Sequence, residues 1–284
     1  MAANPVVAAT DGSEESLRAV EWAAREAVLR GAPLRIVNAV ALPPRMSSAH
    51  PESEYDDVTD VISKGANKAL QAASDRAGTA APGLLFDTDH LDGAPAEAVT
   101  QSGSGALMLV VGSRGRGGFA ALILGSVSRY AATHASCPVV VVREAPEGTR
   151  LQVAVGVGDL EHAEAPLTFA FEEAAARKAS LIVVHAWHTG ESDISRAGEA
   201  LGHDMEEAAS AGLERMLTDW RAKYPDVQVS QDVVHGHPGR ALVGLSARTD
   251  LVVIGRRSPH HGAGSVINAV LSHAHGPVAT VPTA

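Results

Sequence analysis

The stretch Gly112–Gly118, GSRGRGG, has a composition that suggests chemistry. Four of its seven residues are glycine and two are arginine. Glycines allow successive backbone amides to face one side and remove the Cβ atoms that would block an approaching anion. The arginines bring positive charge to the same place. Such a loop could hold a phosphate chain, and the alternative is an ordinary turn between a strand and a helix.

The spacing beyond this loop favours the phosphate interpretation. The pattern runs Gly112, two residues, Gly115, nine residues, then Gly125 and Ser126. A helix is predicted to begin near Ser126, whose amide and hydroxyl would lie at the positive end of the helix dipole. There is no Gly-Lys-Ser/Thr, so the loop is not a Walker loop. Residues 115–120 fit G-x-G-x-x-A but lack the acidic residue about 20 positions on that a dinucleotide fingerprint needs.

A second polar turn, Thr10-Asp11-Gly12-Ser13, follows the first apolar segment. Ser13 is predicted to cap the next helix, and Glu14 and Glu15 would already compensate its dipole and repel phosphate. We therefore expect phosphates at the Gly112 loop. Asp11 would then lie at the nucleoside end, where its carboxylate can accept hydrogen bonds from hydroxyl groups.

The elements that position these residues occur twice in the chain. Residues 26–40 align with 173–187, and residues 125–142 align with 264–281, which indicates a tandem duplication. The join falls in the short polar stretch 143–150. We predict two domains, 1–145 and 149–284, each of ordinary domain size.

Within the first copy, apolar β-branched runs alternate with helical patterns. Strands are predicted at PVVAAT, LRIVNAV, LLFDTDHL, ALMLVVG and PVVVVR, with a helix after each of the first four. The acidic run 51–57 is interpreted as a solvated loop leading into the second helix. This order predicts an α/β fold with a parallel sheet covered on both faces. Ligands of such sheets bind beyond the carboxyl ends of the strands, where strand order reverses.

Composition excludes several partners. The net charge is −10 and the sequence pI is near 5.7, which works against binding to nucleic acid or to an anionic membrane surface. No apolar run approaches the roughly 20 residues of a membrane span, and the first residues resemble no export signal. Cys137 is the single cysteine, and we interpret it as a small buried residue. We expect a soluble cytoplasmic protein.

The sequence also resembles a known family. VVAATDGSEES, WAAREAVLRGAPL, GSRGRGGFAALILGSVS and HASCPVVVVR are similar to motifs of the universal stress protein family in its tandem-domain form. The resemblance covers nearly the whole chain and is weakest between residues 41 and 83. It implies two Rossmann-like domains of the adenine nucleotide alpha hydrolase-like type, each with a five-stranded parallel sheet.

The resemblance further implies an ATP site in the first domain, usually with Mg²⁺. Asp11 would contact the nucleoside and the backbone around Ala39 the adenine, while the glycine loop and the following helix would hold the phosphates. The complete expected set is Ala9, Thr10, Asp11, Ala39, Val111, Gly112, Arg114, Gly115, Gly125, Ser126, Val127 and Ser128. For Arg114, a solvated side chain is as acceptable as a phosphate contact. The family also pairs domains through the last strand, here residues 138–142 and 277–281.

The second copy departs from this pattern. Aligning Leu181 on Leu34 places Gly158 where Asp11 lies, followed by Asp159. Eight residues separate Gly255 from Gly264, against twelve between Gly112 and Gly125. Ser258 replaces the second glycine, and Pro259 removes one amide donor. We expect the second domain to bind nucleotide weakly or not at all.

Ten of the thirteen histidines lie in the second copy. Pairs such as His235/His237, His260/His261 and His273/His275 could form a metal site or a pH-responsive surface, but no cysteine or carboxylate completes a standard spacing. We interpret them as scattered surface residues and assign no metal ligands.

Three functions remain open from the sequence. The first is an ATP-binding regulatory protein of the stress response, acting through unknown protein partners. The second is a slow ATPase, for which no catalytic residue can be named because no base is placed for the attacking water. The third is a scaffold without nucleotide, whose histidine-rich second domain binds metal or a partner.

Overall fold

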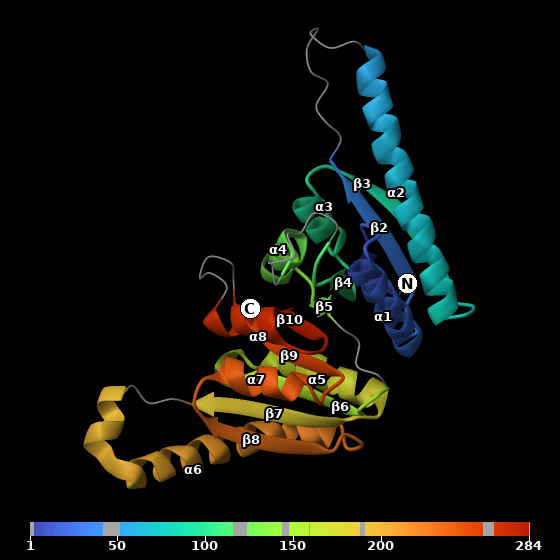
Figure 1. Cartoon of the computed structure of the whole chain (residues 1–284). Helices are drawn as coiled ribbons and strands as arrows, with labels where there is room; N and C mark the ends of the chain where they lie inside the picture. The colour runs from blue at the N-terminus through green and yellow to red at the C-terminus, as the bar shows by residue number, and fades with distance from the viewer. Residues whose placement is uncertain are drawn as a thin grey trace. The chain divides into compact units, whose positions relative to one another are not determined.

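The computed structural model describes residues 3–41, 52–115, 124–143, 148–158, 160–187, 191–257 and 264–283. The chain divides into two compact units, Met1–Glu144 and Ala145–Ala284. Each unit alternates strands with helices (Figure 1). None of the helices in the described ranges is long and apolar enough to cross a membrane.

The first unit contains five strands and four helices in strict alternation over its described residues. They are β1 (Val6–Ala9), α1 (Glu14–Arg30), β2 (Leu34–Val40), α2 (Glu52–Ala80), β3 (Phe86–Asp92), α3 (Pro95–Ser102), β4 (Met108–Gly112), α4 (Ser126–His134) and β5 (Val139–Val142).

The second unit repeats this order, with one additional 3₁₀ turn before its first helix. Its elements are β6 (Gln152–Val157), η1 (Leu160–His162), α5 (Glu164–Arg177), β7 (Ser180–Trp187), α6 (Glu191–Lys223), β8 (Val229–His235), α7 (Pro238–Ser246), β9 (Leu251–Arg256), α8 (Ser265–His273) and β10 (Val278–Pro282).

Both sheets are parallel and have the same strand order. The first runs β3-β2-β1-β4-β5 and the second β8-β7-β6-β9-β10. The α/β fold predicted from the sequence is confirmed. In each unit the chain moves outward from the central strand and then crosses to its other side, so strand order reverses between β1 and β4 and between β6 and β9. A crevice is expected at the carboxyl ends of these strand pairs.

Helices cover both faces of each sheet. In the first unit α1 contacts α2, and α3 contacts α4, as expected when the crossover to β4 changes face. Strands β1, β4 and β5 are buried along their whole length. This burial explains why they appear as continuous apolar runs in the sequence and not as alternating ones.

Helix α1 has a clear start and end. Ser13 caps its first turn, with its side chain accepting a hydrogen bond from the Ser16 amide, as the sequence predicted. Gly31 ends it in the left-handed conformation at φ 60°. Between them the helix buries small residues such as Ala19, Ala23 and Ala27, which allow it to lie close to the sheet.

An arginine on α2 joins the two helices of this face. The Arg76 guanidinium donates to Glu14 at 3.1 Å and to Glu21 at 3.2 Å, and both carboxylates belong to α1. Burial alone would lower the pKa of Arg76, but the hydrogen bonds and the charges of these two carboxylates outweigh it, so the pKa is raised.

The acidic run after residue 51 differs from the expectation. The backbone is helical from Glu52 onward, so residues 52–57 begin α2 and are not a loop that precedes it. Acidic residues are favourable in the first turn of a helix because they lie at the positive end of its dipole. Residue 51 itself lies outside the described residues.

The end of β4 lies against the start of α1 without room for a side chain. A Cβ atom on Gly112 would lie 2.7 Å from the Glu15 carbonyl oxygen and 2.9 Å from the Ser16 amide nitrogen. Both neighbours are backbone atoms, so neither can rotate away. Glycine is therefore required at this position by helix packing, whatever the loop binds.

Replacing Gly112 with alanine should reduce stability. We expect Gly112→Ala to lower the free energy of unfolding by about 1–3 kcal/mol, the usual cost of overpacking. Gly65→Ala is the matched control, because a Cβ on Gly65 in α2 meets nothing within 4 Å. That change should be neutral or stabilise by up to about 1 kcal/mol. Urea denaturation of both variants measures the difference, and equal stability would contradict the packing role of Gly112.

Candidate functional site

The turn after β1 is held by a network of short polar side chains. The Thr10 and Ser16 hydroxyls lie 3.0 Å apart and are buried. The Asp11 amide donates to the Ser16 hydroxyl, and the Gly12 amide donates to Thr10 Oγ1. Gly12 itself has φ 80°, a conformation that favours glycine. The network fixes the path of the backbone from the strand into α1.

The carboxylate of Asp11 is oriented by Ser13. Its Oδ1 accepts hydrogen bonds from the Ser13 amide at 3.0 Å and from the Ser13 hydroxyl at 2.6 Å. Its Oδ2 faces Gly115, where a Cβ atom would lie only 2.5 Å away. The structure thus brings the predicted nucleoside residue and the predicted phosphate loop together. Gly115 also has to be small for Asp11 to keep this position.

Strand β2 supplies the third side of the site. The Asn38 Nδ2 donates to the Thr10 carbonyl at 2.7 Å, which ties the end of β1 to its neighbour. The Asn38 Oδ1 is buried without a hydrogen-bond partner among the described residues. Such an acceptor is costly in a folded core and is often found where a ligand binds. Asn38 was not predicted as a site residue, because its position inside an apolar strand resembles a core position.

Ala39 lies beyond the end of β1. The ladder between the two strands ends at the Ala9–Val37 pair, and the Thr10 amide donates to the Val37 carbonyl. Backbone groups alternate sides along a strand, so the N–H and C=O of Ala39 face the same side as those of Val37. They therefore face the space beyond the end of β1, next to Asp11.

The loop after β4 returns to the strand before α4 begins. The Gly125 amide donates to the Ser113 carbonyl at 2.8 Å, and the Ser128 hydroxyl donates to the Gly112 carbonyl at 2.5 Å. Helix α4 starts at Ser126, as predicted, and its N-cap residue is Gly125, which has no side chain to cap the helix. The Ser128 hydroxyl thus donates its proton to the carbonyl at the end of β4. Residues 116–123, which include Arg116, lie outside the described residues.

Arg114 contacts an acidic residue of α1. Its guanidinium lies 3.3 Å from the Glu15 carboxylate, and the Arg114 side chain is 45% exposed. The pair reduces the negative charge at the first turn of α1. The sequence predicted both residues near the site but did not anticipate their pairing.

The predicted residues thus differ in their surroundings. Asp11, Gly115 and Gly125 lie on the turns that meet at the carboxyl ends of β1 and β4. Ala9 and Val111 are buried within those strands, and Val127 is half-buried in the first turn of α4. Ser126 is exposed beside it.

The strand registers show which residues of the second unit correspond to the site residues of the first. Val153 pairs with Leu181 as Val6 pairs with Leu34, so Gly158 occupies the position of Asp11, as the alignment predicted. His185 takes the place of Asn38, and its Nδ1 lies 2.9 Å from the Val157 carbonyl. Asp159 lies outside the described residues.

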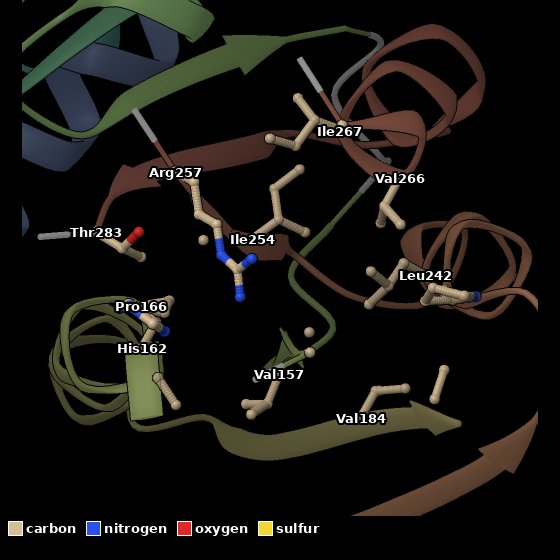
Figure 2. A pocket seen from close by; sticks show the side chains of 17 residues that line it. Val157, His162, Pro166, Val184, Leu242, Ile254, Arg257, Val266, Ile267 and Thr283 are labelled. Carbon is tan, nitrogen blue, oxygen red and sulfur yellow. The ribbon is translucent and has the colours of Figure 1, made fainter. Parts of the chain in front are cut away.

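The crevice of the second unit contains a cavity of about 510 Å³. It lies between the ends of β6, β7 and β9 and the starts of α7 and α8 (Figure 2). Most of its walls are apolar, including Val157, Val184 and Ile254, and Arg257 extends into it. No acidic side chain is among the described residues that line it.

A scan with models of protein families matches the Universal stress protein family at residues 3–143 and again at residues 150–282. The chain belongs to the universal stress protein family. The two matches also bear out the tandem arrangement inferred from the internal repeat.

Relatives of this universal stress protein align along its whole length. Universal stress protein Rv2005c of Mycobacterium tuberculosis is 35% identical over 96% of this chain and 95% of its own. Universal stress protein Rv2623 of the same organism is 32% identical over 93% of this chain and 90% of its own. A crystal structure of a universal stress protein from Archaeoglobus fulgidus shares the fold, with a TM-score of 0.70, 19% identity and 99% of both chains covered.

The histidines of this universal stress protein form no metal cluster in the parts of the chain that the structure describes. His237 has a local role, because its Nδ1 accepts a hydrogen bond from the Gly239 amide and caps α7. His260 and His261 lie outside the described residues. Cys137 is buried, as expected, and lies close to Gly103.

Removing the Ser13 side chain tests the turn. Ser13→Ala removes the cap of α1 and one hydrogen bond to Asp11, so we expect the free energy of unfolding to fall by about 1 kcal/mol. Ser104→Ala, at an exposed loop position, is the control and should change it by less than about 0.5 kcal/mol. Chemical denaturation provides both values. If the two variants are equally stable, the cap contributes nothing.

Proposed function

We propose that this universal stress protein binds ATP in its first unit and that nucleotide occupancy regulates its association with partner proteins in the stress response. The observation that carries the proposal is the meeting of Asp11 with Gly115. A carboxylate fixed by Ser13 stands directly against a glycine of the loop, at the strand reversal where α/β sheets bind ligands.

The two helix N-termini at this site differ in their suitability for phosphate. Helix α1 is capped by Ser13 and carries Glu14 and Glu15 in its first turn, so its dipole is already compensated. Helix α4 has no side-chain cap and no acidic residue in its first turn. Its amides, together with those of the glycine loop, provide the stronger attraction for an anion. We therefore place the phosphate chain at the start of α4.

The opposite side of the site suits an adenine base. The backbone N–H and C=O of Ala39 face the space beyond β1, and together they match the ring nitrogen acceptor and the amino donor on the edge of adenine. The buried Asn38 Oδ1 offers a further acceptor nearby. The Asp11 carboxylate lies between this side and the loop, where it can accept hydrogen bonds from ribose hydroxyls.

Mg²⁺ would enter with the nucleotide. This ion prefers oxygen ligands and keeps several waters, so phosphate oxygens and water can supply most of its ligands. Ser126, in the first turn of α4, adds a hydroxyl of the appropriate kind. Bound Mg²⁺ would neutralise part of the phosphate charge, and the chain itself would hold and orient the nucleotide.

Regulation explains the site better than hydrolysis. Among the described residues, Asp11 and Glu15 bring carboxylates to the glycine loop. We place Asp11 at the nucleoside end, and Glu15 pairs with Arg114. A rapid ATPase would need a group that positions water opposite the terminal phosphate. The family name supports a stress role, and slow turnover would be incidental to binding.

The nucleotide content of the purified chain tests the proposal. We expect protein that is freshly purified, denatured and analysed by anion-exchange chromatography to release about one ATP per chain. Release of ADP, with repeated turnover of added ATP, would favour an ATPase. No released nucleotide and no calorimetric binding of Mg·ATP would refute the proposed function.

A glycine-to-alanine substitution in each unit should show which unit binds ATP. Gly115→Ala places a Cβ 2.5 Å from Asp11 Oδ2, so the carboxylate must move, and we expect at least a tenfold loss of ATP affinity by calorimetry. Gly264→Ala is the matched control in the second unit, because its Cβ would meet nothing within 4 Å. It should leave ATP affinity unchanged. A larger loss of ATP affinity in Gly264→Ala than in Gly115→Ala would show that the nucleotide binds in the second unit instead.

A further inference from the structure

The cavity of the second unit has lost the hydrogen-bonding groups that shape the first site. Three hydroxyl-bearing residues of the first unit are replaced by apolar residues that line the cavity. The replacements are Val157 for Thr10, Ala163 for Ser16 and Ile267 for Ser128. The first two follow from the strand register, and the third from the aligned Gly125-Ser126 and Gly264-Ser265 pairs. The walls therefore favour an apolar ligand body.

The charges have changed as well, and one carboxylate has moved by a position, because Asp159 stands where the first copy has Gly12. Two carboxylates of the first unit are lost at the matching positions, and one arginine is retained. The matching pairs are Gly158 for Asp11, His162 for Glu15 and Arg257 for Arg114. In the first unit the Glu15 carboxylate lies 3.3 Å from Arg114. At these two positions the second unit therefore has no counterpart of the Glu15–Arg114 ion pair.

The retained arginine is directed at the cavity. Figure 2 shows the Arg257 side chain extending from the end of β9 into the space between Val157, Ile254 and Pro166. A guanidinium presents several donors in one plane and binds a carboxylate with two parallel hydrogen bonds. The cavity thus combines apolar walls with a cationic group that projects into it.

We propose that this cavity binds a small apolar carboxylic acid, with the carboxylate on Arg257 and the hydrocarbon body against Val157, Ile254 and Ile267. The volume of about 510 Å³ lies within the range of ligand pockets, which is about 300–1,000 Å³. A nucleotide fits the cavity poorly, because the counterpart of Asp11 is Gly158 and the loop after β9 is four residues shorter and contains a proline. The inference is independent of ATP binding in the first unit.

Calorimetry with straight-chain acids tests this inference on the full chain. We expect hexanoate and octanoate to bind at one site per chain, with affinity rising about fourfold for each added methylene. Octanoate should bind at least tenfold more tightly than 1-octanol, because the alcohol cannot form the ion pair. Saturating Mg·ATP should not displace octanoate.

Two variants and one control test whether octanoate binds in this cavity. Arg257→Met keeps the apolar stem and removes the charge, and we expect at least a tenfold loss of octanoate affinity. Arg248→Met, at an exposed position outside the lining, should leave the affinity unchanged. Val266→Trp fills the cavity from a half-buried lining position and should abolish octanoate binding. Thermal unfolding checks that each variant is folded.

Several results would overturn the inference. These are no saturable binding of octanoate, equal affinity for octanoate and 1-octanol, or unchanged affinity in a folded Arg257→Met protein. One-for-one displacement of octanoate by Mg·ATP in the Gly115→Ala background would instead assign the cavity to a nucleotide. None of these results depends on whether the first unit binds ATP.

Discussion

In each unit one central strand is paired on both sides, by the next strand of the chain on one side and by a strand distant in sequence on the other. The chain runs outward from β1 to β2 and β3 and then returns to form β4 on the other side of β1. This reversal separates the turns that follow β1 and β4 and creates the crevice. The close approach of α1 to Gly112 and the bond from Asn38 to Thr10 both maintain it. The polar residues beyond the strand ends have defined positions because these contacts leave the strand ends little freedom.

The two copies share one scaffold, so comparing them shows what single residues change. Both units keep the strand order, the register and a side chain that bridges the first two strands, Asn38 in one and His185 in the other. What differs is the chemistry beyond the strand ends. Both units present a guanidinium, Arg114 in one and Arg257 in the other. The first unit adds hydroxyls and carboxylates, and the described lining of the second unit is mostly apolar. The fold therefore fixes the place of the crevice, and a few turn residues fix the chemistry of its walls.

Much of this arrangement could be predicted from the sequence. The buried strands have continuous apolar runs, and the Ser13 cap and the start of α4 have local signals, so each was predicted correctly. The need for glycine at Gly112 could not be predicted, because it depends on the approach of α1, far away in sequence. The Arg114–Glu15 pair and the side-chain roles of Asn38 and Ser128 depend on similar long-range contacts. The acidic start of α2 was wrongly predicted to be a loop, because a run of acidic residues is typical of a solvated loop as well as of the first turn of a helix.

The contact between Asp11 and Gly115 has one more consequence. The Asp11 carboxylate can keep its observed position only while position 115 lacks a side chain, so the two positions are sterically coupled. In the second copy both have changed, to Gly158 and Ser258. Once the carboxylate was absent, the opposing glycine was no longer required. A substitution at either position therefore changes which residues are tolerated at the other, and the two copies of this chain represent two permitted combinations.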